Sequence, residues 1–294
     1  MDNNKTTTKI YLNKIYNEDC LEGMKRIPDN SVDCILTDPP YLYLKNQKLD
    51  RPFDELVFFS ECKRVLKKDG FIVLFGRGTS FYRWNCILAD MGFTFKEEII
   101  WDKIKSSSPL LPIQRVHETI SIHCIGNKKI KKSHIKYEEH IIYNKEKVLC
   151  DLKRLKNVLS NFKELTIVQQ YLENKSFNFL YGSKNGVTCH NIKVQSPCLG
   201  VARKIKDGVL ERDVINLKRD YKAIHQTQKP VRLLERLLNI VCDEGCTVLD
   251  PFSGSASTAI ACINTKRNYI GFEIDKEYYD LSVNRIKKYT DENN

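Results

Sequence analysis

Residues 247–256 decide the fold class, and they are Thr247-Val248-Leu249-Asp250-Pro251-Phe252-Ser253-Gly254-Ser255-Ala256. The run contains an apolar strand, a tight turn of small residues and the start of a helix. Such a turn lets the backbone approach a ligand closely at a helix N-terminus. The next expected strand ends about twenty residues later at Glu273, where a carboxylate can accept both hydroxyl protons of a ribose. This unit predicts a site for an adenosine-containing ligand.

Outward from this unit, short apolar runs alternate with amphipathic stretches, which is typical of an α/β sheet with helices on both faces. Runs that are apolar throughout indicate parallel strands buried on both faces. We therefore expect a doubly wound, mostly parallel sheet. The expected strands are Val32–Thr37, Phe71–Phe75, Glu98–Trp101, Thr119–Ile125, Thr247–Leu249 and Tyr269–Glu273. The expected helices are Phe53–Lys67, Ser80–Met91, Val231–Cys242, Ala256–Ile263 and Glu277–Tyr289.

A second candidate site follows the first of these strands. Val32–Thr37 leads directly into Asp38-Pro39-Pro40-Tyr41, and ligands of open α/β sheets collect at the carboxyl ends of the strands. Two successive prolines fix the backbone, so the carboxylate and a rigid carbonyl form two acceptors aimed at one point. An NH₂ group has two hydrogens to fill them, and the tyrosine offers a flat face for a stacked base. The alternative is an ordinary Asp-Pro turn.

The positive charge of the chain is concentrated in one segment. The net charge is +11 over 294 residues, and residues 127–224 contain 21 Lys and Arg against 10 Asp and Glu, while the remainder is balanced. Such a local excess of positive charge suits binding to a phosphate backbone. A basic surface exposed to solvent explains the excess as well. The alternation of strands and helices also weakens there. We expect residues 127–224 to form an insert, around which residues 1–126 and 225–294 close into one domain.

Together these motifs resemble the β class of DNA amino-methyltransferases, in which Asp-Pro-Pro-Tyr precedes a Phe-x-Gly cofactor motif along the chain. The other matching segments are Asn17–Leu21, Pro28–Asp33, Ile100–Lys103, Val116–Glu118 and His225–Pro230. The resemblance covers residues 1–126 and 225–294. It implies a Rossmann-like methyltransferase sheet, mostly parallel with one antiparallel strand, and it makes the basic insert the target-recognition region.

The resemblance also implies roles for single residues. The catalytic motif is Asp38, Pro39, Pro40 and Tyr41. The cofactor S-adenosylmethionine, with S-adenosylhomocysteine as product, is bound by Asp19, Cys20, Thr227, Lys229, Phe252, Ser253, Gly254, Ser255 and Glu273. Glu273 is implied to bind the ribose, Asp19 to lie near the adenine, and Thr227 and Lys229 to lie near the methionine portion. One departure is Ala256, where the family usually has a second glycine. We expect its methyl group to be tolerated because the residue lies in the helix.

The implied reaction is methyl transfer to the exocyclic N6 of adenine in duplex DNA, after the base has flipped out and stacked on Tyr41. The aspartate that opens the motif favours adenine N6 over cytosine N4, which is the main alternative. Cytosine C5 chemistry needs a cysteine nucleophile, and the Pro-Cys pair at Cys198 lies inside the insert. An inactive DNA-binding homologue, an RNA substrate and a polypeptide glutamine amide are further alternatives.

Composition adds expectations about the surroundings of the protein. A polar N-terminus without a long apolar run favours a cytoplasmic protein that does not cross a membrane. The 11 cysteines are scattered without a CxxC pair, so we expect no metal. Double-stranded DNA is the expected partner, and a cognate restriction endonuclease and a homodimer are left open. The recognition sequence depends on which side chains of residues 127–224 reach the bases, and the sequence does not reveal it.

Overall fold

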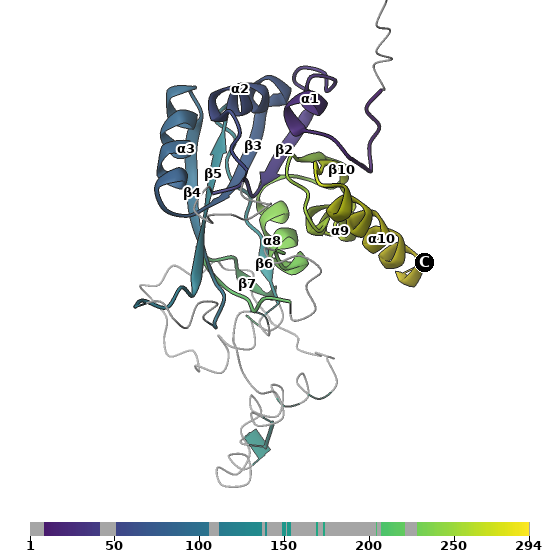
Figure 1. The fold of residues 1–294 in the computed structure, drawn as a ribbon. Coiled ribbons are helices and arrows are strands. Elements are labelled where there is room, and N and C mark those ends of the chain that lie inside the picture. The colour runs from purple at the N-terminus through teal and green to yellow at the C-terminus, as the bar shows by residue number, and fades with distance from the viewer. Residues whose placement is uncertain are drawn as a thin grey trace, which may run out of the picture. The chain divides into compact units, whose positions relative to one another are not determined.

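The structure is a computed structural model, and it describes residues 9–41, 51–105, 112–136, 208–220 and 228–293, with isolated positions between 139 and 207. The chain divides into two compact units, Met1–Lys131 with Arg212–Asn294, and Lys132–Glu211. The first unit contains an eight-stranded sheet (Figure 1). In the second unit, β6 (His134–Ile135) and β7 (Val209–Leu210) pair as an antiparallel ladder.

The eight strands lie in the order β1, β10, β9, β2, β3, β5, β4, β8. Their bounds are β1 Lys14–Tyr16, β2 Val32–Thr37, β3 Leu66–Gly76, β4 Thr94–Asp102, β5 His117–Cys124, β8 Val214–Asn216, β9 Thr247–Asp250 and β10 Asn268–Phe272. β5 runs antiparallel to both of its neighbours, and the other strand pairs of this sheet are parallel. The predicted mostly parallel sheet with one antiparallel strand is therefore confirmed.

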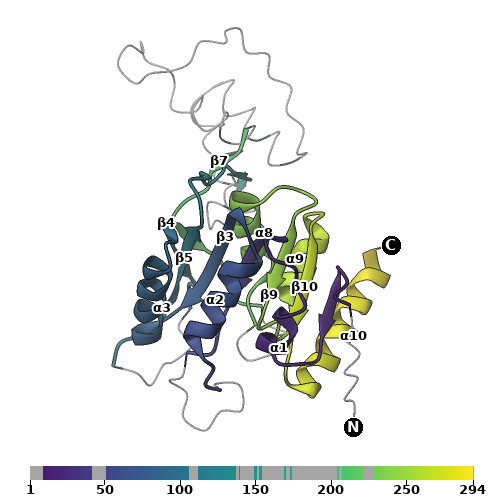
Figure 2. The same cartoon turned by 90° about the horizontal axis from the view of Figure 1, so that it is seen from above.

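Helices cover both faces of the sheet (Figure 2). Their bounds are α1 Cys20–Met24, α2 Glu55–Val65, α3 Gly78–Asp90, α8 Val231–Val241, α9 Ser257–Asn264 and α10 Lys276–Asn293. Along β3, Ile72 and Leu74 pack into a core with α2 and α3, whereas Phe71 and Val73 pack into a core with α8 and α9. Each fully buried side chain of this kind stabilises the fold by about 1.5–3 kcal/mol. No helix in the described part of the chain is long and apolar enough to cross a membrane.

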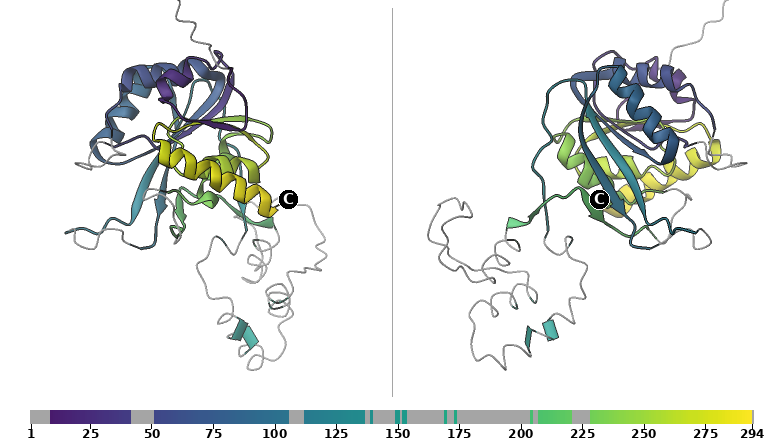
Figure 3. Two further views of the ribbon diagram at one scale, coloured as in Figure 1. Left: turned by 45° about the vertical axis from the view of Figure 1, so that its right-hand side comes forward. Right: turned by 90° about the vertical axis from the view of Figure 1, so that its left-hand side faces the viewer.

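The predicted strands and helices all occur; β2 has the predicted bounds, and the other elements have shifted ends. Lys67 was expected to end a helix, but it lies in β3, because the chain turns into the strand at Leu66 directly after α2. Five short elements of the described part of the chain were not expected, since so few residues carry no periodic pattern; they are β1, α1, β6, β7 and β8. β8 lies in the range expected for the insert, yet it pairs with β4 in the main sheet. The left view of Figure 3 shows α10, in yellow, in front of the sheet.

Candidate active site

The sheet brings the ends of four strands to one edge. Asp38 follows β2, and residues 252–255 follow β9, which pairs with β2. Glu273 follows β10 and Asp19 lies just beyond β1, and these two strands also pair. The backbone N–H of Glu273 donates to the Tyr16 carbonyl at 2.9 Å, so the ends of β1 and β10 are in direct contact. The two candidate sites therefore lie at the same edge of one sheet.

The loop after β9 is fastened to the end of β10. The Gly254 N–H donates to Glu273 Oε2 at 2.9 Å, and the Asp275 N–H donates to Oε1 at 2.8 Å. Gly271 permits this approach, because a Cβ there would lie 2.2 Å from Ser253 Oγ. The Glu273 side chain is thus held rigidly beside the loop, as a residue that binds a ribose must be.

Carboxylates at this edge of the sheet interact electrostatically. Burial raises the pKa of Asp250 to about 7, and the charges of Asp38 and Glu273 act in the same direction. Burial also raises the pKa of Glu273 above its ordinary value. The negative charges of Asp38 and Glu273 therefore make Asp250 harder to ionise.

The Asp38 carboxylate is bound on both oxygens. The Tyr41 hydroxyl donates to Oδ1, and the Lys229 ammonium donates to Oδ2. Ser80 Oγ donates to the Tyr41 carbonyl at 2.8 Å and so fixes the backbone of the motif to α3. The Tyr41 ring lies 6.1 Å from the Trp84 ring, centroid to centroid. The predicted catalytic acid and the predicted stacking residue are therefore in contact.

A second buried carboxylate, Glu118 at the start of β5, shares the lysine with Asp38. Lys229 Nζ lies 3.3 Å from Glu118 Oε2, while Lys103 and Arg219 lie 3.2 and 3.1 Å from Oε1. Burial alone would raise the pKa of Glu118, but these three cations outweigh it and lower that pKa to about 2. Burial raises the pKa of Asp38, against the opposing charge of Lys229. Burial would lower the pKa of Lys229, but the two carboxylates raise it overall.

The other predicted cofactor residues lie in different surroundings. Asp19 caps α1 by accepting the Leu21 N–H at 2.8 Å. The Cys20 thiol is 6% exposed, and burial raises its pKa to about 12. Phe252 packs with its ring centroid 5.4 Å from that of Phe53. Thr227 lies outside the described residues. The cofactor roles of these residues stay predictions.

Ala256 differs from the expectation. It precedes α9 as the N-cap, with φ 61° and ψ 25°, instead of lying within the helix. This is the left-handed region, where a Cβ costs roughly 1–2 kcal/mol and glycine is favoured. We expected the methyl group to be tolerated because the residue would lie in the helix, and that reason is wrong. Ala256 lies instead in the turn that leads into α9.

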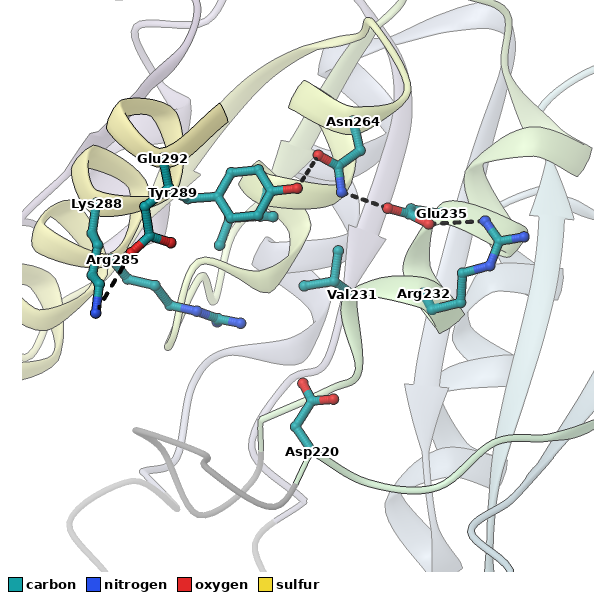
Figure 4. Close-up of a pocket in the computed structure, with 10 residues that line it drawn as sticks. Asp220, Val231, Arg232, Glu235, Asn264, Arg285, Lys288, Tyr289 and Glu292 are labelled. Carbon is teal, nitrogen blue, oxygen red and sulfur yellow. Dashed lines mark hydrogen bonds and ion pairs between the residues drawn. The ribbon is translucent and has the colours of Figure 1, made fainter. Parts of the chain in front are cut away.

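A cavity of about 540 Å³ lies between α8, α9 and α10 (Figure 4). Its lining includes none of the predicted site residues. Glu235 accepts from Asn264 at 2.6 Å and from Arg232 at 2.9 Å on one side of it. Across the part of the chain that the structure describes, no three His, Cys, Asp or Glu side chains gather to hold a metal ion.

Comparison with known proteins decides the family. Residues 32–284 match the family model of the N6/N4 DNA methylases. The chain belongs to this DNA methylase family. The methylase is 27% identical to the type II methyltransferase M.HinfI of Haemophilus influenzae, over 97% of this chain and 71% of the relative. It is 29% identical to the type II methyltransferase M.BglII of Bacillus subtilis, over 97% and 72%. It is 27% identical to the DNA adenine methyltransferase YhdJ of Escherichia coli, over 92% and 82%.

Solved structures share the fold of the methylase. The crystal structure of the M1.HpyAVI–SAM complex has a TM-score of 0.55 at 21% identity, covering 92% of this chain and 98% of the other. The PvuII DNA methyltransferase, described as cytosine-N4-specific, has a TM-score of 0.58 at 15% identity, covering 94% and 86%. The predicted Rossmann-like methyltransferase fold is confirmed, and the methylase is a DNA methyltransferase.

Sequence reasoning missed the ion pairs of Glu118 with Lys229, Lys103 and Arg219. Glu118 stood in a segment that matched the family, but no spacing rule connects it to Lys229, 111 positions later. Only the pairing of β5 with β3 brings it to the strand edge where Asp38 lies. The available signal was an acid at the first residues of an apolar strand.

Proposed function

We propose that this methylase transfers a methyl group from S-adenosylmethionine to the exocyclic N6 of adenine in double-stranded DNA. The observation that carries the proposal is the position of Asp38 at the end of β2, beside the strand that leads into residues 252–255. A carboxylate that accepts an amine hydrogen and a loop suited to an adenosine-containing ligand thus lie at neighbouring strand ends.

The residues at this edge fit the proposed cofactor. Glu273 is held by the loop in a position suited to a ribose, and the negative charge of the carboxylates at this edge suits a positively charged cofactor. When bound, S-adenosylmethionine supplies a methyl group on a positively charged sulfur, and the electron pair of the broken carbon–sulfur bond stays on that sulfur. The M1.HpyAVI–SAM complex, whose fold this chain shares, supports the same cofactor.

The residues of the motif hold the amine. The target nitrogen donates one hydrogen to Asp38 and one to the Pro39 carbonyl, which turns its lone pair toward the methyl carbon. The target atom cannot be reached inside a duplex, so the base flips out, and the Tyr41 ring supports it by stacking. After transfer the nitrogen carries one proton too many, which Asp38 accepts and passes to water. The basic insert supplies phosphate contacts that offset the flip, which costs a few kcal/mol.

Adenine is proposed over cytosine for two reasons. The motif opens with aspartate at position 38, and the relative YhdJ is described as a DNA adenine methyltransferase. Cytosine N4 offers the same kind of amine. The two substrates would therefore require base pockets of different shape, whereas the methyl-transfer chemistry would be the same.

The experiment is methylation of duplex DNA with labelled cofactor, followed by digestion to nucleosides and mass spectrometry. The expected product is N6-methyladenine, and N4-methylcytosine would contradict the choice of base. Asp38→Ala is expected to lower the rate by at least about 100-fold while cofactor binding persists. Wild-type turnover in this variant would contradict the role of Asp38. Asp54→Ala, which removes the N-cap of α2, is the control for a lost carboxylate outside the site.

A further inference from the structure

Glu118 carries a further inference, which rests on the proposed methyl transfer. The Lys229 side chain is 9% exposed, and its ammonium group faces two carboxylates and an aromatic ring. It contacts Asp38, lies 3.3 Å from Glu118 and lies 5.1 Å from the centroid of Phe75. One cation is thus shared by two acids, of which only Asp38 belongs to the catalytic motif.

The sharing matters because Lys229 and the target amine compete for Asp38. Both are donors, and the Tyr41 hydroxyl already occupies Oδ1. A lysine bound to Asp38 alone would weaken the acceptor that the amine needs. It would also lose its only counter-charge when Asp38 takes the proton that the methylated nitrogen releases. A buried ammonium without a partner is strongly destabilised.

We propose that Glu118 is a positioning residue of the methyl-transfer site, which holds the Lys229 ammonium so that Asp38 can accept the target amine and its proton. Lys103 and Arg219, at 3.2 and 3.1 Å from Oε1, keep Glu118 ionised and in place from its other side. Glu118 does not touch the reacting atoms. It keeps Lys229 paired at every stage, whichever protonation state Asp38 adopts.

Charges around Asp38 make the proposal measurable. The groups that act on it are Lys229, Glu118, Tyr41 and Asp250. Glu118 raises the pKa of Asp38, so replacing Glu118 with glutamine lowers that pKa and strengthens the hold of Lys229 on Asp38. Replacing Arg219, which is 39% exposed as a side chain, removes a cation that neutralises Glu118 and therefore acts in the opposite direction.

The test compares single-turnover rates of Glu118→Gln, Arg219→Met and the wild type on duplex DNA between pH 5 and 9, with cofactor dissociation constants. For Glu118→Gln we expect a rate about 10- to 100-fold lower and a cofactor affinity within about threefold of the wild type. We also expect the acid limb of the pH–rate profile, where the rate falls as the pH falls, to lie about one pH unit lower. For Arg219→Met we expect the acid limb at higher pH. Glu118→Asp is expected to recover part of the rate. Glu235→Gln, equally buried at 8% exposure but outside the site, is expected to match the wild type.

Two outcomes overturn the proposal. One is a wild-type rate and an unmoved acid limb in Glu118→Gln. The other is a loss of rate that follows a lowered melting temperature while neither variant moves the acid limb, which would make Glu118 structural. If Glu118→Gln does not fold, Arg219→Met decides by the direction of its shift. A wild-type protein that transfers no methyl group would instead contradict the proposed function.

Discussion

Ala256 adopts φ 61° and ψ 25° and is 1% exposed. Ala256→Gly removes left-handed strain of roughly 1–2 kcal/mol and gives up a buried methyl group worth about 0.8 kcal/mol. We expect the free energy of unfolding to stay equal or to rise by up to about 1 kcal/mol. Urea denaturation measures this free energy, and we expect the slope of the free energy against urea concentration to stay unchanged.

The matched control is Ala259→Gly, a buried residue inside α9. There glycine loses both helix propensity and methyl burial, so a loss of about 2 kcal/mol is expected. Equal losses in the two variants would show that the backbone of residue 256 carries no strain.

Glu273 accepts one backbone N–H on each carboxylate oxygen, from Gly254 and from Asp275. Glu273→Gln replaces one oxygen with a donor, so one of these bonds is lost, and so is the charge-assisted bond that we propose Glu273 makes to the ribose. We expect the dissociation constant for S-adenosylhomocysteine, measured by calorimetry, to rise about 10- to 100-fold. Glu277→Gln, exposed in the first turn of α10, should leave it unchanged. Equal affinities of both variants would argue against a ribose at Glu273.

Among the elements, the long ones follow from local pattern and the short ones do not. α8 repeats apolar residues at helical spacing, so burial of one face favours the helix. Residues 71–75 of β3 form a continuous apolar run, which is typical of a strand buried on both faces. β1 and β8 have three residues each and exist because a neighbouring strand offers unpaired backbone groups. Their positions therefore depend on contacts that lie far away in sequence.

β5 contains a pH-sensitive group. His123 is 2% exposed, its Nε2 lies 2.8 Å from Asn85 Oδ1 on α3, and burial lowers its pKa to about 4. Between pH 6.5 and 4 the unfolded chain binds a proton that the folded chain refuses, so the free energy of unfolding falls as the pH falls. The full shift corresponds to about 3 kcal/mol.

His123→Gln is expected to flatten this slope while retaining a polar contact to Asn85. The measurement is urea denaturation at several pH values from 7 to 4, and the control is His117→Gln, an exposed position on the same strand. If the wild type and His123→Gln lose stability in parallel over this window, the slope comes from other groups.

For the molecule as a whole, the second unit has a short ladder at its ends. His134 pairs with Leu210 and Ile135 with Val209, and Gly208 has φ 80°. Deleting residues 137–207 and changing Lys136 to Asn would join the ladder by an Asn-Gly turn, which suits a two-residue hairpin. The first unit contains the whole eight-stranded sheet, so we expect this variant to fold and to keep its cofactor affinity within about threefold.

The same deletion removes 12 Lys and Arg and 7 Asp and Glu. We expect duplex DNA binding, followed by fluorescence anisotropy at two salt concentrations, to weaken by at least about 100-fold and to lose much of its salt dependence. DNA affinity equal to that of the full chain would contradict the assignment of residues 127–224 to target recognition.

By itself, the sequence determined the family, the strands with apolar cores and the acids at strand ends, because each of these follows from a local pattern of a few residues. The tertiary structure alone decided that Asp38 shares Lys229 with Glu118, that Glu273 holds Gly254, and that Ala256 turns left-handed. The sharing of Lys229 depends on the order in which distant strands pair, whereas the other two depend on how the loop after β9 packs against the end of β10. Electrostatic and hydrogen-bonding contacts act through space, so Asp38, Glu118 and Lys229, which are 80 or more positions apart, meet only once the sheet has formed.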